Sequence, residues 1–223
     1  ETVAAQYLNE QVATVDDALQ GARDIMAEWI NEDKKARDRV RRHFDKGAVI
    51  ASRVVRGKEK EADKYRDYFE WSEKLAQCPS HRLLAMRRGE EEGFLRVAIA
   101  PDEERVLYDL DELYIIGSGA ASTQVRMALR DGYKRLLLPS IETEYRNSSK
   151  EKADIEAIRV FAENLRQLLL AAPLGEKRVM GIDPGFRTGC KVICLDENGN
   201  LLHNTTIYPH EPQRQMFESQ AAL

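Results

Sequence analysis

The sequence is poor in the cysteines and histidines from which zinc centres and disulfides are built. Its 223 residues include three cysteines and four histidines. Cys78, Cys190 and Cys194 have no zinc-ligand spacing, and the last two lie too far apart along one predicted strand to form a disulfide. An odd number of free thiols is typical of a reducing compartment. We therefore expect a cytoplasmic protein without a zinc site.

Long apolar runs and targeting features are also lacking. The apolar stretch at residues 168–174 is far shorter than the roughly 20 residues that span a bilayer. The first residues, ETVAAQYLNE, have neither the basic start nor the apolar centre of a signal peptide. The sequence contains no phosphate-loop lysine motif and no pattern typical of a Ser-His-Asp or Cys-His nucleophile. We expect no membrane contact and no small-molecule substrate.

Charge is abundant but unevenly distributed. The net charge is −4, whereas residues 34–66 contain 13 Lys and Arg against 5 Asp and Glu, a local balance of +8. Such an asymmetry permits contact with a polyanion on one part of an otherwise acidic protein.

Residues 1–175 are predicted to be mostly helical. Apolar residues recur at three- and four-residue steps in 14–31 and 33–46, and Thr14 and Asp17 have capping-box spacing. A helix is expected to close at Gly89, and another to begin at Pro139 and either run to Ala172 or break at residues 147–149.

Two β-branched runs interrupt these helices. Residues 48–55 and 94–100 are expected to pair as a small β ribbon, with a loop and a short helix after the first run.

The pattern changes at residue 176. RVMGID, CKVICLD and LLHNTTIY predict three antiparallel strands, and Asn198-Gly199 is a strong hairpin signal. The second strand is apolar on both faces and needs cover on both, which three strands and the start of one helix do not supply. We therefore expect 176–223 to be the N-terminal part of a larger domain.

Several long strings resemble the Tex family of bacterial transcription accessory proteins. They are RVMGIDPGFRTGCKV, NTTIYPHEPQ, ALQGARDI, KYRDYFEWSEKLA, PSHRLLAMRRGEEEG and EAIRVFAENLRQLLLAAPLG. The resemblance implies a nucleic-acid-binding protein that works with RNA polymerase. It also implies a mostly α fold, in which a multi-helical region is followed by the first three antiparallel strands of an incomplete RNase H-like α/β domain of YqgF type. On this basis residues 1–175 are the helical Tex region and 176–223 the truncated YqgF-type part. The modules to which the family's main RNA binding is assigned would follow.

Asp183 ends the first strand of that domain. The resemblance places it at the first metal carboxylate of RuvC-like nucleases, which hold two Mg²⁺ ions between several carboxylates. Asp196 and Glu197 lie at the far end of the second strand, so any partner carboxylate would follow residue 223. In the simpler interpretation Asp183 accepts hydrogen bonds from the loop at 184–188. A third interpretation takes GIDPGFRTGCKV as the first phosphate motif of the sugar kinase and actin superfamily, but about 175 helical residues precede it here.

The basic segment provides the other candidate site. Lys35, Arg39, Arg42 and Lys46 share one face of the helix predicted at 33–46, and Arg53 and Lys58 follow. Tyr65, Tyr68, Phe69 and Trp71 lie beyond. Basic and aromatic side chains together suit binding of nucleic acid through counterion release and stacking. The alternative is a solvated helix face with the aromatic residues in the core.

Three functional hypotheses follow. The preferred one is a non-catalytic helical scaffold that binds nucleic acid or polymerase and needs no cofactor. The second is a metal-dependent RNase H-like nuclease with Asp183 as its first Mg²⁺ ligand. The third is a helical module that binds only proteins.

Overall fold

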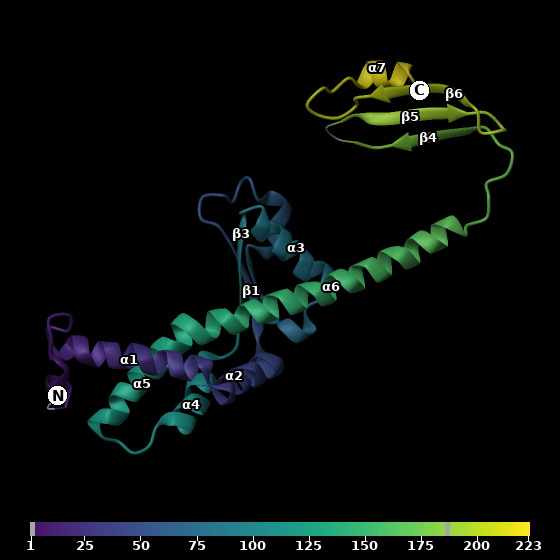
Figure 1. Cartoon of the computed structure of the whole chain (residues 1–223). Coiled ribbons are helices and arrows are strands. Elements are labelled where there is room, and N and C mark those ends of the chain that lie inside the picture. The colour runs from purple at the N-terminus through teal and green to yellow at the C-terminus, as the bar shows by residue number, and fades with distance from the viewer. Residues whose placement is uncertain (1–2, 186–187) are drawn as a thin grey trace. The chain divides into compact units, whose positions relative to one another are not determined.

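The structure, a computed structural model, describes residues 3–185 and 188–223, which form two units, Glu1–Asn164 and Leu165–Leu223. Helices dominate the first unit and an antiparallel sheet dominates the second (Figure 1). Among the described residues, no helix is both long enough and apolar enough to cross a membrane.

The first unit contains six α-helices among its described residues, a three-stranded sheet and short 3-10 helices. The α-helices are α1 (Val15–Glu32), α2 (Lys34–Gly47), α3 (Ser80–Glu91), α4 (Glu103–Tyr114), α5 (Ala120–Gly132) and α6 (Leu138–Leu169). The strands are β1 (Val49–Val54), β2 (Glu70–Lys74) and β3 (Leu95–Ala100). The 3-10 helices span Ala4–Tyr7, Asp63–Tyr68 and Leu75–Gln77.

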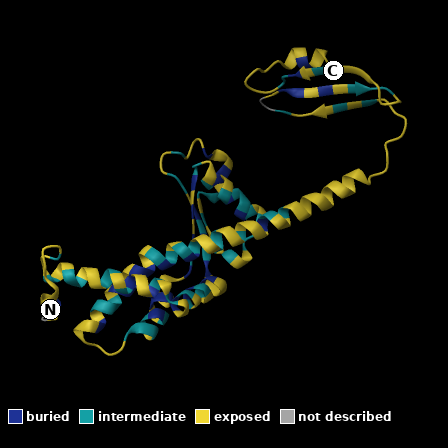
Figure 2. Cartoon of the chain, in the orientation of Figure 1, coloured by how far each residue is buried: buried dark blue, intermediate teal, exposed yellow. Residues whose placement is uncertain are grey.

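The first two helices begin and pack as their sequences predict. The capping box at α1 is confirmed, because the Asp17 amide donates to Thr14 Oγ1 while the Thr14 amide donates to Asp17 Oδ2, each at 3.1 Å. The apolar stripe of α2 is also confirmed: Ala36, Val40 and Phe44 are at most 2% exposed. The core of the first unit forms where this stripe meets the sheet and α6 (Figure 2).

The predicted β ribbon is one part of a larger sheet. β1 pairs antiparallel with β3, as expected, and also with β2, giving the order β2-β1-β3. The prediction of only a loop and a short helix after β1 was incomplete, because β2 follows the short helix. Its sequence, EWSEK, is mostly polar. Trp71 and Glu73 are half-buried and alternate with exposed residues, but no alternation of apolar and polar residues marks the strand in the sequence.

Gly89 does not end α3, contrary to the prediction. The helix continues to Glu91, and Gly89 lies inside it, where Leu95 of β3 packs against its backbone. A Cβ at residue 89 would lie 2.6 Å from Leu95 Cδ1. The glycine therefore permits close helix–strand packing rather than a helix stop.

Pro139 lies in the first turn of α6, as predicted, but α6 continues from α5 without an intervening loop. A π-helical segment, Tyr133–Leu137, joins α5 to α6, and the Leu138 amide donates to the Tyr133 carbonyl five residues back. Proline has no N–H to donate to the carbonyl four residues earlier, and a wider π turn accommodates that loss. Of the two expectations for α6, the unbroken helix is confirmed, since Ser148 and Ser149 stay helical and donate to carbonyls of their own helix. The helix ends at Leu169, three residues before the predicted Ala172.

The second unit is a meander of three strands. These are β4 (Val179–Asp183), β5 (Cys190–Leu195) and β6 (Leu201–Ile207), in the order β4-β5-β6, followed by α7 (Met216–Ala221). The three predicted strands are confirmed, and Gly199 has a φ of +80° in the β5–β6 turn. Cys190, Val192 and Ile207 form a small core on one face of this sheet.

Helices α1 and α5 cross closely at Gly132, which gives a test of their packing. A Cβ at residue 132 would lie 3.1 Å from the Ala27 Cα, whereas a Cβ at Gly21, also helical, would meet no atom within 4 Å. We expect Gly132→Ala to lower the free energy of unfolding by about 1–3 kcal/mol through overpacking. The control, Gly21→Ala, should raise it by about 0.5–1 kcal/mol. Urea denaturation of both variants measures this difference, and equal effects would contradict the crossing.

Candidate nucleic-acid interface

An open groove of about 590 Å³ runs along the exposed face of α2. It is lined by Lys35, Asp38, Arg39, Arg41, Arg42 and Asp45 of α2 and by Leu113 of α4. Residues three, four and seven positions apart on a helix share a face, which is why one helix supplies nearly the whole wall. Three of the six basic residues predicted to bind nucleic acid therefore meet in one concave surface.

The cations of this groove differ in how far the fold already uses them. Lys35, Arg42 and Lys46 are exposed, and within residues 3–185 and 188–223 none of them forms an ion pair. Arg42 makes one long hydrogen bond, 3.4 Å, to the Asp38 carbonyl of its own helix. Lys46 extends the same face beyond the groove-lining residues. These three side chains are available for phosphate oxygens.

Arg39 is half-buried and links α2 to α4. Its guanidinium donates to the Asp109 carbonyl at 2.9 Å, and His43 Nε2 lies 2.7 Å from Asp109 Oδ2. These contacts hold α4, and with it Leu113, against α2. Arg39 therefore shapes the groove and adds positive charge to it.

Arg41 is held by a carboxylate of α6. Its Nε and Nη2 donate to the two oxygens of Glu144 at 2.9 and 3.0 Å, and Arg37 Nη2 donates to the same carboxylate at 2.8 Å. The bond to Glu144 raises the pKa of Arg41, and the same arginines lower the pKa of Glu144. Two arginines of α2 that share one carboxylate of α6 make this a rigid contact.

Arg53 and Lys58 do not line the groove. Arg53 is exposed on β1, opposite Glu70 and Arg96 of the neighbouring strands. Lys58 is half-buried: its ammonium donates to the Gly93 carbonyl at 3.1 Å and lies 5.7 Å from the centre of the Phe94 ring. Lys58 thus closes a loop of the first unit and has less freedom to bind a ligand.

The aromatic residues that follow the basic segment belong to the core. Tyr65 is 5% exposed, and Tyr68, Phe69 and Trp71 pack against the main hydrophobic cluster. Arg82 covers the Trp71 ring at 4.7 Å. The rings are therefore used for packing, and the groove offers charge rather than base stacking.

Asp183 ends β4 and is exposed. In the sheet it lies opposite Lys191 of β5, and Lys191 lies opposite Thr206 of β6. Directly opposed residues have Cβ atoms roughly 4.5–5.5 Å apart, so a lysine is the nearest charged cross-strand neighbour of this carboxylate. Part of the loop expected to donate hydrogen bonds to Asp183, at Phe186 and Arg187, lies outside the described residues.

The residues around Asp183 do not fit a pair of divalent metals. Such a pair needs several oxygen ligands, whereas the cross-strand row supplies one carboxylate, one ammonium and one hydroxyl. Asp196 lies at the other end of β5, where it accepts hydrogen bonds from the amides of Asn198 and Asn200, and the Asn200 side chain lowers its pKa. In the described part of the chain, no three His, Cys, Asp or Glu side chains are placed to hold a metal.

Sequence reasoning missed the residues that shape the groove from other helices. Leu113 and Asp109 lie on α4, which was not predicted, although Asp102 caps it and Val106, Leu107 and Leu110 have helical spacing. The contact of Glu144 with α2 could not be predicted, because a single carboxylate on a charged helix has no distinctive sequence pattern. Its distance from α2 along the chain, about a hundred residues, conceals the contact.

The fold is thus a helical unit with a basic helix face, followed by an antiparallel β4-β5-β6 meander. The model of the Tex central region-like family matches residues 1–161, and that of the Tex protein YqgF-like domain matches residues 177–223. The chain belongs to the Tex family, and its second unit lies in a YqgF-like, RNase H-like domain.

Curated relatives agree with this assignment. The chain is 40% identical to Protein tex of Bordetella pertussis, and the match covers 95% of the chain and 29% of the relative. It is 38% identical to Transcriptional accessory protein Tex of Neisseria gonorrhoeae, with 95% and 29% covered. It is 29% identical to human S1 RNA-binding domain-containing protein 1, with 89% and 21% covered. The chain thus spans less than a third of the length of these relatives.

The contact between Glu144 and α2 predicts a pH-dependent stability. Because its arginine partners lower the Glu144 pKa, the stabilisation is present above the pKa of the unfolded carboxyl and is lost as the pH falls through the lower folded value. Glu144→Gln should lower the free energy of unfolding by about 1 kcal/mol at neutral pH, since the side chain is 41% exposed.

Urea denaturation at neutral and acidic pH measures this difference. The gap between wild type and variant should narrow as the pH falls below about 4. Glu151→Gln, an exposed change on the same helix, is the control and should have little effect at either pH. A gap for Glu144→Gln that stays constant with pH would contradict the ion-pair account.

Proposed function

We propose that this chain is a non-catalytic scaffold that binds nucleic acid through the α2 groove. The observation that carries the proposal is the convergence of Lys35, Arg39 and Arg42 on one groove wall, with Lys46 on the same helix face. Phosphate contacts of this kind give affinity that is independent of base sequence. The core position of the nearby aromatic rings favours contacts with the backbone over contacts with bases.

The relatives support the same class of function for the whole protein. One bacterial relative is named a transcriptional accessory protein, and one human relative is named for an S1 RNA-binding domain. We propose that this protein likewise acts as a cytoplasmic transcription accessory factor that binds RNA or DNA and contacts RNA polymerase. We also propose a domain boundary at 175/176, between the two segments that the family models match.

The groove is tested by the salt dependence of binding. Lys35→Glu combined with Arg42→Glu should weaken binding of a single-stranded RNA oligonucleotide by the 223-residue chain. The slope of log K against log salt concentration should fall by about 1.4, since each lost contact with a single strand removes about 0.7. Fluorescence anisotropy over a salt series measures both quantities.

The matched control changes the same amount of charge elsewhere. Arg56→Glu with Lys60→Glu alters two exposed cations of the same basic segment that do not line the groove. It should leave the slope close to that of the wild type. Equal losses in both double variants would mean that overall charge, and not the groove, determines binding.

A nuclease is the competing function, favoured by the exposed carboxylate of Asp183 at the end of β4. The residues around Asp183 argue against a nuclease, because Lys191 lies opposite this carboxylate in the sheet. An ammonium group on the neighbouring strand repels a divalent cation. We therefore infer that this strand end holds no catalytic metal.

Manganese titration tests this inference without an activity assay. Binding of Mn²⁺ to the 223-residue chain, followed by electron paramagnetic resonance, should be no tighter in the wild type than in Asp183→Asn. Glu197→Gln, at the opposite end of β5, is the control. A submillimolar site that Asp183→Asn removes and Glu197→Gln preserves would support the nuclease instead.

A further inference from the structure

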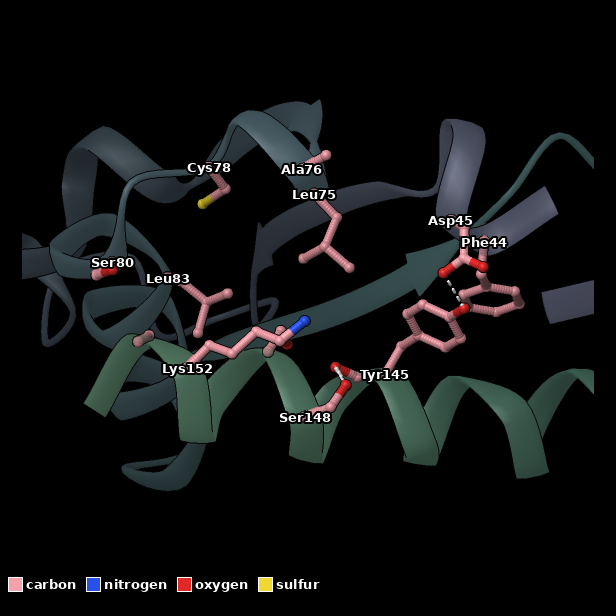
Figure 3. A pocket seen from close by; sticks show the side chains of 12 residues that line it. Phe44, Asp45, Leu75, Ala76, Cys78, Ser80, Leu83, Tyr145, Ser148 and Lys152 are labelled. Carbon is pink, nitrogen blue, oxygen red and sulfur yellow. Dashed lines mark hydrogen bonds between the residues drawn. The ribbon is translucent and has the colours of Figure 1, made fainter. Parts of the chain in front are cut away.

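A second cleft, of about 350 Å³, lies between the end of α2, residues 75–80, the start of α3 and the middle of α6 (Figure 3). Asp45 is the one described residue that lines both this cleft and the α2 groove. The other residues that line the cleft are mostly apolar or bear hydroxyl groups, whereas those that line the α2 groove are mostly charged. The two are therefore separate surfaces.

The floor of the cleft is apolar and already ordered. Phe44, Leu83 and Ala153 are at most 4% exposed, and Leu75 is half-buried beside them. The Phe44 ring stacks on Tyr145, with ring centres 4.7 Å apart. A floor of fixed rings and branched side chains suits an apolar group of a ligand and requires little rearrangement.

One face of α6 forms the polar wall. Tyr145, Ser148, Ser149 and Lys152 lie at steps of three, four and seven residues, which extends the wall over roughly 10 Å of helix. That length corresponds to about three residues of an extended peptide. The cleft is therefore long enough for a short segment of chain.

The cleft has a positive side and a negative end. Lys152 extends from α6 into the cleft (Figure 3), and no described residue forms an ion pair with it. Lys150, two residues earlier, is paired with Asp154 at 2.6 Å. Ser80 opens α3 without a side-chain cap, so unpaired amides of that helix add partial positive charge.

Asp45 occupies the other end and is already bonded. The Tyr145 hydroxyl donates to Asp45 Oδ1 at 2.5 Å. Burial and this carboxylate together raise the pKa of the Tyr145 phenol. A second negative charge would be repelled here, so the cleft accepts a carboxylate beside Lys152 but not beside Tyr145.

Cys78 lines the cleft without making it a catalytic site. Burial and the nearby Glu73 carboxylate raise the pKa of its thiol to about 12, so the thiol stays protonated near neutral pH. The Cys78 Sγ atom lies 3.7 Å from the Pro79 carbonyl oxygen. An inert thiol over an apolar floor is a packing group, which leaves binding as the role of the cleft.

We propose that this cleft binds a short extended segment of a partner protein, with a side chain of leucine or phenylalanine size next to an aspartate or glutamate. The apolar side chain lies over Phe44 and Leu83, and the carboxylate pairs with Lys152. Charge complementarity favours an acidic partner, since Lys152 is the unpaired ion of the wall and Asp45 is already bonded. This site is additional to the nucleic-acid groove and does not depend on it.

The test uses two blocked peptides, Gly-Gly-Phe-Asp-Gly-Gly and its Phe-Asn counterpart, and the 223-residue chain. Binding is followed by the NMR shifts of the backbone amides of residues 145–153. We expect the Phe-Asp peptide to shift these amides and to bind more tightly than the Phe-Asn peptide. Lys152→Glu should weaken binding of the Phe-Asp peptide by about fivefold, the upper end of what one exposed ion pair contributes.

Two further variants separate the cleft from general charge and from folding. Lys150→Glu makes the same charge change on the same helix and should leave the affinity unchanged. Ser148→Phe places a ring at the exposed rim and should abolish binding while the remaining spectrum stays folded.

Three results of the peptide experiments would overturn the proposal. They are equal binding of the two peptides, equal losses in Lys152→Glu and Lys150→Glu, and no shift of these amides at the highest soluble peptide concentration. Shifts of the same amides by a six-nucleotide RNA but by neither peptide would also overturn it, and would assign the cleft to the nucleic-acid surface.

Discussion

Glu144 and Tyr145, neighbours on α6, hold α2 in place, and both candidate surfaces depend on that contact. Glu144 accepts hydrogen bonds from Arg37 and Arg41, while Tyr145 stacks on Phe44 and donates to Asp45. The first contact fixes the turn that carries the groove cations. The second fixes the end of α2 where the smaller cleft begins. A fork of charged hydrogen bonds and a ring stack restrict both the position and the rotation of α2.

This arrangement assigns separate tasks to separate faces of one helix. The buried stripe of α2 forms the core, its outer face presents unpaired cations, and its C-terminal end borders the apolar cleft. A helix that is fixed from one side can offer preorganised charges on the other, which limits the entropy lost on binding. Asp183 lies on β4 in the other unit, opposite Lys191 of β5. A lysine at this position is unlike the cluster of carboxylates that a metal-dependent nuclease needs.

The sequence predicted what local periodicity and capping determine, and little that depends on contacts between distant segments. The capping box at Thr14, the stripe of α2 and the three C-terminal strands all follow short-range rules. The strand β2 was missed because most of its residues are polar, so no apolar residues alternate along it. The role of Gly89 was missed because it depends on Leu95, in a strand that follows later in the chain. For the groove, spacing placed Lys35 and its neighbours on one face, but only the fold shows which cations are free. Strand register, which sequence leaves open, placed Lys191 opposite the predicted metal ligand.

The most direct test of the central claim is to map where nucleic acid touches the chain. A single-stranded RNA carrying 4-thiouridine would be photocrosslinked to the 223-residue chain at low salt, and the crosslinked peptides identified by mass spectrometry. The account predicts crosslinks concentrated in residues 34–47, which form α2. They should be lost when Lys35 and Arg42 are changed to glutamate. Crosslinks confined to β4-β5-β6, or spread evenly over the surface, would contradict it.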